Sequence, residues 1–130
     1  MSNNALLRDP IKYVRDRAKA RYKKGSQCEI CEATENLDFH HYYTMTPLFN
    51  KWCKDNGYTV KVVDDILSIR DKFISAEDDK IYNQTVTLCH EHHMKLHSVY
   101  GKDPALHTAE KQMRWVLIQK EKHEARKLVT

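Results

Sequence analysis

The run that decides the fold reads Thr87-Leu88-Cys89-His90-Glu91-His92-His93-Met94-Lys95-Leu96-His97. It contains one of the four cysteines of the chain and four of its eight histidines. A second run lies upstream and consists of Cys28-Glu29-Ile30-Cys31 and Phe39-His40-His41-Tyr42. Together the two runs hold enough thiol and imidazole ligands for two metal sites. The sequence therefore points to metal chemistry.

The cysteines predict a structural zinc site. Cys28 and Cys31 form a Cys-x-x-Cys pair, and Cys89 with His92 forms a Cys-x-x-His pair far along the chain. Four such ligands suit tetrahedral zinc, which would staple the loop before the first expected strand to the start of an expected helix over 90–99. The alternative is two unrelated sites with reduced cysteines.

The remaining histidines predict a second, more open site. His93 and His97 are four residues apart and share one face of a helix, whereas His92 and His93 point about 100° apart and can serve two different ions. One member of the His40-His41 pair would complete the second site, because consecutive strand residues face opposite ways. Three protein ligands with open positions are typical of a catalytic ion, and the other histidine of the pair would act as a general base. The alternative is a set of surface histidines without a shared role.

The rest of the chain predicts an α+β fold in which helices flank the short strands. A helix over 8–24 is expected to start at Asp9-Pro10 and to end at Gly25, because Asp is a good N-cap and Pro fits the first helical position. A strand is expected over 36–43 and another over 85–88, and 58–63 could be a third. Further helices are expected at Thr46-Pro47, around Ile66 to Ile74, over 90–99 and over 108–127, where Thr108 can be the cap.

The first 24 residues are strongly basic, with eight basic and two acidic side chains. The functional interpretation is a helix that contacts the phosphates of DNA through Lys12, Arg15, Lys19 and Lys23. The alternative is an ordinary solvated helix face. The segment 58–82 balances acidic against basic residues, so it carries no such prediction.

Length and composition set the outer limits. At 130 residues the chain is expected to be a single domain, 1–130, and its net charge of +4 is only mildly basic. No apolar run approaches the 18 residues of a membrane-spanning helix, and the N-terminus lacks the apolar stretch of a signal peptide. A reducing, cytoplasmic location is therefore expected, where Cys-x-x-Cys favours a metal or redox site over a disulfide.

The spacing of these motifs resembles the HNH endonuclease family. The resemblance rests on Cys28-x-x-Cys31, on Asn36-Leu37-Asp38-Phe39-His40-His41, and on the run from Thr87 to His97. It covers residues 25–98, with an insertion over 44–82 outside the usual pattern. It implies a small ββα-metal (His-Me finger) core, in which two antiparallel strands and a helix surround one catalytic ion.

The resemblance also implies roles for single residues. His41 would be the general base, and His40, His93 and His97 would hold the catalytic ion, which could be Mg²⁺, Mn²⁺, Ni²⁺ or Zn²⁺. The structural zinc of the family is usually held by four cysteines, so a histidine ligand is a departure, though a mild one. Asn83, or Gln84 beside it, would take the place of the middle Asn and tether the loop that carries the base.

The function implied is that of a metal-dependent DNA endonuclease that nicks or cuts duplex DNA and leaves 5′-phosphate and 3′-hydroxyl ends. Its size suggests a phage or homing enzyme, which would work in the cytoplasm of a host cell. Double-strand cutting turns on oligomeric state, and the insertion could be the surface of a homodimer, a DNA contact or neither. The alternatives are a zinc-stabilised nucleic-acid-binding module without catalysis and, more weakly, a redox protein that uses Cys28 and Cys31.

Overall fold

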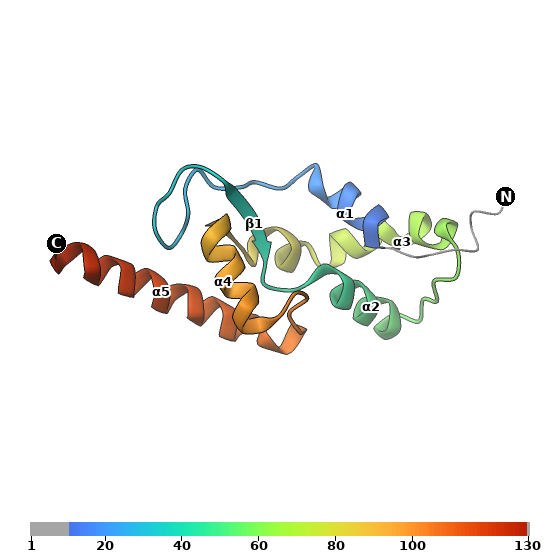
Figure 1. Cartoon of the computed structure of the whole chain (residues 1–130). Coiled ribbons are helices and arrows are strands. Elements are labelled where there is room, and N and C mark those ends of the chain that lie inside the picture. Colours follow the sequence, from blue (N-terminus) through green and yellow to red (C-terminus); the bar gives the residue numbers. More distant parts are fainter. Residues whose placement is uncertain (1–10, 130) are drawn as a thin grey trace. The chain divides into compact units, whose positions relative to one another are not determined.

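A computed structural model describes residues 11–129 (Figure 1). These residues form two units: one contains 11–22 and 45–83, and the other contains 23–44 and 84–129. The first unit thus joins the basic helix to the segment that lies outside the HNH-like pattern. The second unit contains all the predicted metal ligands.

The second unit is built on two strands and two helices. β1 (Leu37–His41) pairs antiparallel with β2 (Thr85–Cys89), in a register that sets His40 opposite Val86. The chain leaves β2 directly into α4 (His90–Tyr100), which packs against both strands (Figure 1). A 3₁₀ turn, η3 (Leu106–Thr108), then leads into the long helix α5 (Ala109–Val129). The α+β class and the strand–helix order around residue 89 are as predicted.

The core of the second unit forms between the sheet and these two helices. Its buried residues come from the cysteine loop, the residue after β1, β2, α4 and α5: Cys28, Ile30, Tyr42, Leu88, Cys89, Leu96, Ala109 and Val116. Four of these are cysteines or lie beside one, so the core of this small unit is continuous with the predicted zinc site. A core of this size gains from such a staple.

The first unit is helical. It contains α1 (Ile11–Lys19), α2 (Met45–Asp55), α3 (Val63–Ala76) and a short π-helical turn, η2 (Asp79–Asn83). Apolar residues at helical spacing bury one face of each helix, and Phe73 of α3 stacks edge-on against Phe49 and Trp52 of α2. Cys53 is buried in this core.

The predicted C-terminal end of the first helix is wrong. Asp9-Pro10 lies outside the described residues, but α1 ends at Lys19 and not at Gly25. The chain turns away there, and Tyr82 donates a hydrogen bond to the carbonyl of Ala18 (3.0 Å). Gly25 instead lies against β2, where its N–H donates to Thr87 Oγ1 (2.7 Å) and a Cβ atom would come within 3.2 Å of that oxygen.

Residues 58–63 form no strand. The backbone N–H groups of Lys61 and Val62 donate to Asp65 Oδ2 (2.8 and 3.0 Å), which caps the start of α3. The hydrogen bonds of these N–H groups are therefore accepted by a capping side chain at a helix N-terminus and not by the carbonyls of a neighbouring strand. Tyr58 packs its ring on Trp52, which holds the segment against α2.

Candidate metal centres

The Cys28–Cys31 loop is folded by hydrogen bonds that leave both sulfurs facing inward. Cys28 N–H donates to the carbonyl of Ala33 (2.8 Å), and Glu32 N–H donates back to the carbonyl of Cys28 (2.9 Å). Glu32 takes a positive φ of 64°, which closes the turn. The N–H of Ile30 points at Cys28 Sγ (3.4 Å), an arrangement that stabilises a negatively charged sulfur.

Cys89 occupies the junction of β2 and α4 and is the N-cap of the helix. Its Sγ accepts a hydrogen bond from the backbone N–H of His92 (3.5 Å). The partial positive charge at a helix N-terminus favours a thiolate in this position. His92, one turn into the helix, brings its Nδ1 to 3.2 Å from the same sulfur.

The four predicted zinc ligands come together. Cys28, Cys31, Cys89 and His92 place their ligand atoms within 4.8 Å of one another. The separations include 3.9 Å between the sulfurs of Cys31 and Cys89, and 3.9 Å between Cys28 Sγ and His92 Nδ1. Tetrahedral zinc with ordinary bond lengths requires about 3.8 Å between sulfurs and about 3.5 Å between sulfur and nitrogen. The group therefore fits a metal ion of this kind.

The thiols differ in acidity. Burial opposes the charged form of Cys28, but hydrogen bonds from the backbone N–H groups of Cys31, Cys89 and Ile30 outweigh it and lower its pKa. Burial and the neighbouring Cys28 raise the pKa of Cys31 to about 11. A cation among the sulfurs would reverse this, because thiolates are the form that binds metal.

A second cluster joins β1 to α4. His40, His93 and His97 also place their ligand atoms within 4.8 Å of one another. His40 Nδ1 lies 3.1 Å from His93 Nε2, and His97 Nε2 lies 3.0 Å from that same atom. Metal–nitrogen bonds of about 2.1 Å require neighbouring ligand nitrogens about 3.0 to 3.4 Å apart, so these separations suit three ligands of one ion.

Oxygen acceptors beside the Nδ1 atoms of the two α4 histidines fix which ring nitrogen carries the hydrogen. His93 Nδ1 lies 3.0 Å from Asp38 Oδ2, and His97 Nδ1 lies 2.8 Å from the carbonyl oxygen of Gly101. A carboxylate and a carbonyl only accept, so both Nδ1 atoms carry hydrogen. The Nε2 atoms of two neutral rings then face each other as bare lone pairs, which is unfavourable unless a cation lies between them. This is the pattern of metal-bound histidines, whose outer N–H is held by an oxygen acceptor.

Burial favours neutral rings at His40 and His93, and hydrogen bonds favour an ionised carboxylate at Asp38. Burial lowers the pKa of His40 to about 4 and also lowers the pKa of His93. The carboxyl of Asp38 is partly buried, but hydrogen bonds from His90 and His93 outweigh that effect and lower its pKa. Neutral imidazole is the form that binds metal.

His41 lies on the other face of β1. Its ring packs edge-on against that of Phe39 (5.2 Å between centroids), two residues back on the strand, whereas His40 packs edge-on against Tyr42 (5.5 Å). The alternation of the strand thus puts His40 in the cluster and His41 outside it. Of the two residues considered for the middle Asn, Asn83 belongs to the first unit and donates to Asp79 Oδ1 (3.0 Å), while the carbonyl of Gln84 accepts from Tyr42 N–H (3.3 Å).

Two residues that contact the histidine cluster were not singled out from the sequence. Asp38 could have been found, because it lies two residues before His40 and must share its face of the strand. Gln112 of α5 lies with its Oε1 2.7 Å from His40 Nε2. In the sequence, Gln112 stands out only as a polar residue at helical spacing between Ala109 and Val116, which form the buried face of this helix.

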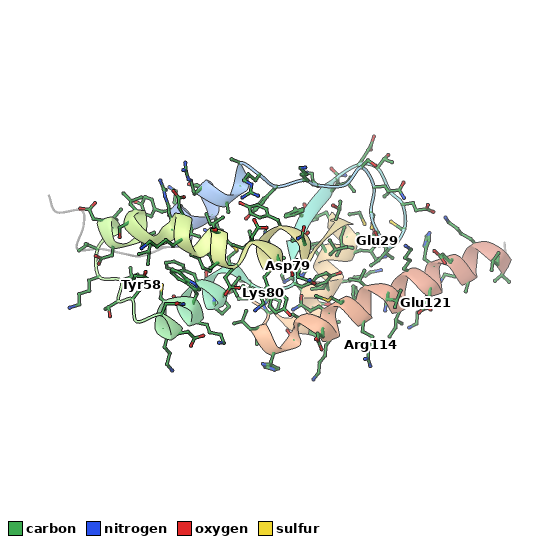
Figure 2. The ribbon with its side chains drawn as sticks, turned by 180° about the vertical axis from the view of Figure 1, so that it is seen from behind. Glu29, Tyr58, Asp79, Lys80, Arg114 and Glu121 are labelled. Atoms are coloured by element: carbon green, nitrogen blue, oxygen red, sulfur yellow. The ribbon has the colours of Figure 1, made fainter. Side chains whose placement is uncertain are left out.

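α5 also reaches the cysteine loop. Lys120 pairs with Glu29 (2.8 Å), and Lys127 pairs with Glu32. Figure 2 labels Glu29 in that loop, and Arg114 and Glu121 on α5. The helix expected over 108–127 runs from Ala109 to Val129, and these pairs connect its second half to the cysteine loop.

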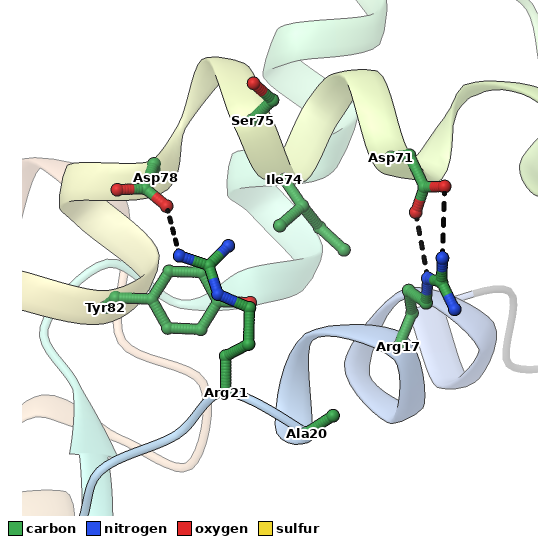
Figure 3. Close-up of a pocket in the computed structure, with 8 residues that line it drawn as sticks. All are labelled: Arg17, Ala20, Arg21, Asp71, Ile74, Ser75, Asp78 and Tyr82. Carbon is green, nitrogen blue, oxygen red and sulfur yellow. Dashed lines mark hydrogen bonds and ion pairs between the residues drawn. The ribbon is translucent and has the colours of Figure 1, made fainter.

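In the first unit, two arginines that raise the basic charge of the N-terminal segment are paired with acids of α3 and the turn after it (Figure 3). Arg17 binds Asp71 (3.0 Å), and Arg21 binds Asp78 (3.4 Å) while lying 4.4 Å from the ring centre of Tyr82. They line a shallow hollow of about 550 Å³ whose charges are already balanced. This part of the basic segment therefore serves the packing of its own unit.

The four predicted phosphate contacts lie elsewhere on this segment. Lys12, Arg15 and Lys19 are exposed on α1, away from the buried stripe of Ile11 and Val14. Lys23 is exposed too, but it follows the helix and belongs to the second unit.

A family of known proteins matches most of this chain. A model described as the nicking endonuclease family, of the phage T5 type, matches residues 1–126, a range that includes both candidate metal clusters. The chain belongs to the nicking endonuclease family. It is accordingly a DNA endonuclease, and nucleic acid is its substrate. No solved structure matches it.

For this nicking endonuclease, no helix among residues 11–129 is both long and apolar enough to cross a membrane.

Proposed function

We propose that this nicking endonuclease is a metal-dependent enzyme of the HNH type. The observation that carries the proposal is the convergence of His40 Nδ1, His93 Nε2 and His97 Nε2 within 4.8 Å, at the junction of a two-stranded sheet and a helix. An antiparallel pair of strands followed by a ligand-bearing helix is the arrangement of a ββα-metal core. We interpret β1, β2 and α4 as that core in one nuclease domain.

The histidine cluster would hold the catalytic ion. A divalent ion bound there would supply positive charge to the scissile phosphate and to the leaving 3′ oxygen. His93 and His97 are only half-buried, which leaves that side of the cluster accessible to a phosphate, whereas His40 closes the other side. Asp38 and the carbonyl of Gly101 hold the α4 rings in the orientation that a ligand needs.

His41 would serve as the general base. It follows His40 on the strand and lies on the opposite face, so it would not be a ligand of the ion. A histidine can accept the proton of an attacking water near neutral pH. Asn83 or Gln84 would tether the loop that carries it. Hydrolysis in which the 3′ oxygen is the leaving group would leave 5′-phosphate and 3′-hydroxyl ends.

The cysteine cluster would hold zinc with a purely structural role. Four protein ligands leave no open position, which is typical of structural zinc. Because Cys89 caps α4 and His92 lies next to His93, this zinc would fix the helix that presents two catalytic ligands. The substrate would be duplex DNA in a host cytoplasm, nicked in one strand and contacted by Lys12, Arg15, Lys19 and Lys23.

A plasmid assay tests the proposal. Supercoiled plasmid is incubated with the protein and with Mg²⁺, Mn²⁺, Ni²⁺ or Zn²⁺, and open circles are separated from linear DNA. Wild type should give open circles with at least one ion, and His41→Ala should lower the rate about 10² to 10⁴-fold, as expected for a lost general base. His107→Ala removes an exposed histidine outside both clusters and serves as the matched control.

Three results would contradict parts of this proposal. Cleavage in a chelator as fast as with added ions would exclude metal dependence. Equal rates for wild type and His41→Ala would remove His41 from the mechanism. Linear DNA as the first product would show double-strand cutting and would favour a homodimer with two active sites.

A further inference from the structure

Gln112 is fully buried although its side chain is a polar amide. A buried amide is costly unless each end finds a partner. Its Oε1 lies 2.7 Å from His40 Nε2, and its Nε2 donates to the carbonyl oxygen of Tyr42 (3.2 Å) and to Thr108 Oγ1 (3.0 Å). Both ends of the amide are therefore satisfied, and one of them contacts a proposed metal ligand.

Two neighbours fix which way this amide points. The carbonyl of Tyr42 can only accept, so the amide nitrogen of Gln112 must face it. Thr108 donates its hydroxyl hydrogen to the carbonyl of Ala105 (2.6 Å), so its oxygen is left to accept from the same nitrogen. Because both partners bind the amide nitrogen, the amide oxygen Oε1 is directed towards the ring of His40.

The direction of the amide decides the tautomer of His40. Because Oε1 only accepts, His40 Nε2 must carry the hydrogen. A neutral imidazole has one N–H, so His40 Nδ1 keeps its lone pair, and this atom lies 3.1 Å from His93 Nε2. In the other tautomer, Nδ1–H would donate to His93 Nε2, and that hydrogen bond would block both nitrogens from an ion.

We propose that Gln112 is a positioning residue that holds His40 in the tautomer able to bind the catalytic ion. The inference rests on the proposed function of the histidine cluster. Asp38 and Gly101 perform the same task for His93 and His97, so each ring of the cluster donates its outer N–H to an oxygen. α5, which follows the HNH-like motifs in the chain, thereby becomes part of the active-site support.

The tautomer can be measured directly. Two-bond ¹⁵N–¹H correlation spectra of the histidine rings are recorded on the full chain, with zinc at the cysteine cluster and no other ion, and the His40 signals are assigned with His40→Gln. Wild type should show hydrogen on Nε2 and a bare Nδ1. A hydrogen on Nδ1 of His40 would overturn the inference without any variant of Gln112.

Three variants separate positioning from packing. Gln112→Met fills the same space without an acceptor, and Gln112→Glu keeps an acceptor but loses both donors. Thr108→Val removes one contact of the amide and leaves the Tyr42 carbonyl to orient it. Binding of Ni²⁺ to the histidine cluster is measured by calorimetry, beside thermal unfolding.

Gln112→Met should weaken Ni²⁺ binding about 10 to 100-fold, as for other supporting partners of metal ligands, and should lose the single His40 tautomer. Gln112→Glu and Thr108→Val should keep the tautomer and bind Ni²⁺ nearly as well as wild type, even where they unfold at lower temperature. Equal weakening in the Met and Glu variants would show that Gln112 only packs. Failure of wild type to bind Ni²⁺ at this cluster would instead contradict the proposed function.

Discussion

Asp38 Oδ2 accepts hydrogen bonds from two histidines of α4, at 3.0 Å from His93 Nδ1 and 2.9 Å from His90 Nδ1. One carboxylate of β1 thus holds the start of α4 and orients a proposed metal ligand at the same time. His90 is exposed and contributes to neither cluster, and its backbone N–H also donates to the carbonyl of Asn36 (2.8 Å). The contact with His93 is the one expected to matter for metal binding.

Replacing Asp38 should weaken the histidine cluster. Asp38→Ala leaves His93 Nδ1 without its acceptor, so the ring loses both its orientation and its preferred proton position. Binding of Ni²⁺ should weaken about 10 to 100-fold, measured by calorimetry with zinc retained at the cysteine cluster. His90→Ala removes only the exposed partner and should bind Ni²⁺ like wild type; equal losses in the two variants would assign Asp38 to helix docking alone.

Removing a cysteine ligand should lower both the zinc content and the stability of the protein. Cys89→Ala deletes a zinc ligand and the N-cap of α4 together, and the free energy of unfolding should fall by several kcal/mol as zinc is lost. Zinc content by mass spectrometry and unfolding in urea measure both effects. His92→Cys gives the site four sulfur ligands and should keep one zinc ion per chain. A Cys89→Ala protein with wild-type zinc content would remove this site.

The sequence predicts the clusters well because ligand spacing is a local property. Two cysteines spaced like Cys28 and Cys31 can bind the same ion from one tight turn. Adjacent residues of a helix point about 100° apart, so His92 and His93 face different directions wherever the helix lies. Gln112 could not be predicted in this way, because its role depends on a helix that returns to the sheet 72 residues after His40. Local patterns also misled at Gly25, which does not end α1 but lies close to Thr87 on another segment.

Acid should loosen α3 through its cap. Hydrogen bonds from the backbone N–H groups of Lys61 and Val62 lower the pKa of Asp65 below its ordinary value of 3.8. The unfolded chain then binds this proton first, so the stabilisation is present above that value and is lost as pH falls through the lower, folded-state pKa. Unfolding in urea at pH 5 and pH 3 should show a smaller loss of stability in Asp65→Asn than in wild type. Asp64→Asn, at the exposed neighbouring position, should behave like wild type.

The exposed lysines of α1 should contribute to DNA binding through charge alone. Lys12 and Lys19 present their side chains to solvent, whereas Arg17 is held by Asp71 (3.0 Å). If each lysine contacts one phosphate, replacing both by alanine should lower the slope of log K against log salt by about 1.8, equally for different duplex sequences. Binding is measured by fluorescence anisotropy in Ca²⁺, with rates of cleavage checked separately in Mg²⁺ or Mn²⁺.

Arg17→Ala is the matched control on the same helix. It removes one positive charge that Asp71 already balances, so it should change the salt slope much less than Lys12→Ala or Lys19→Ala, while lowering stability slightly. A salt slope unaltered in the double lysine variant would mean that α1 is only a solvated face of its own unit. A larger effect from Arg17→Ala than from both lysines would place the DNA on the side of the Arg17–Asp71 pair instead.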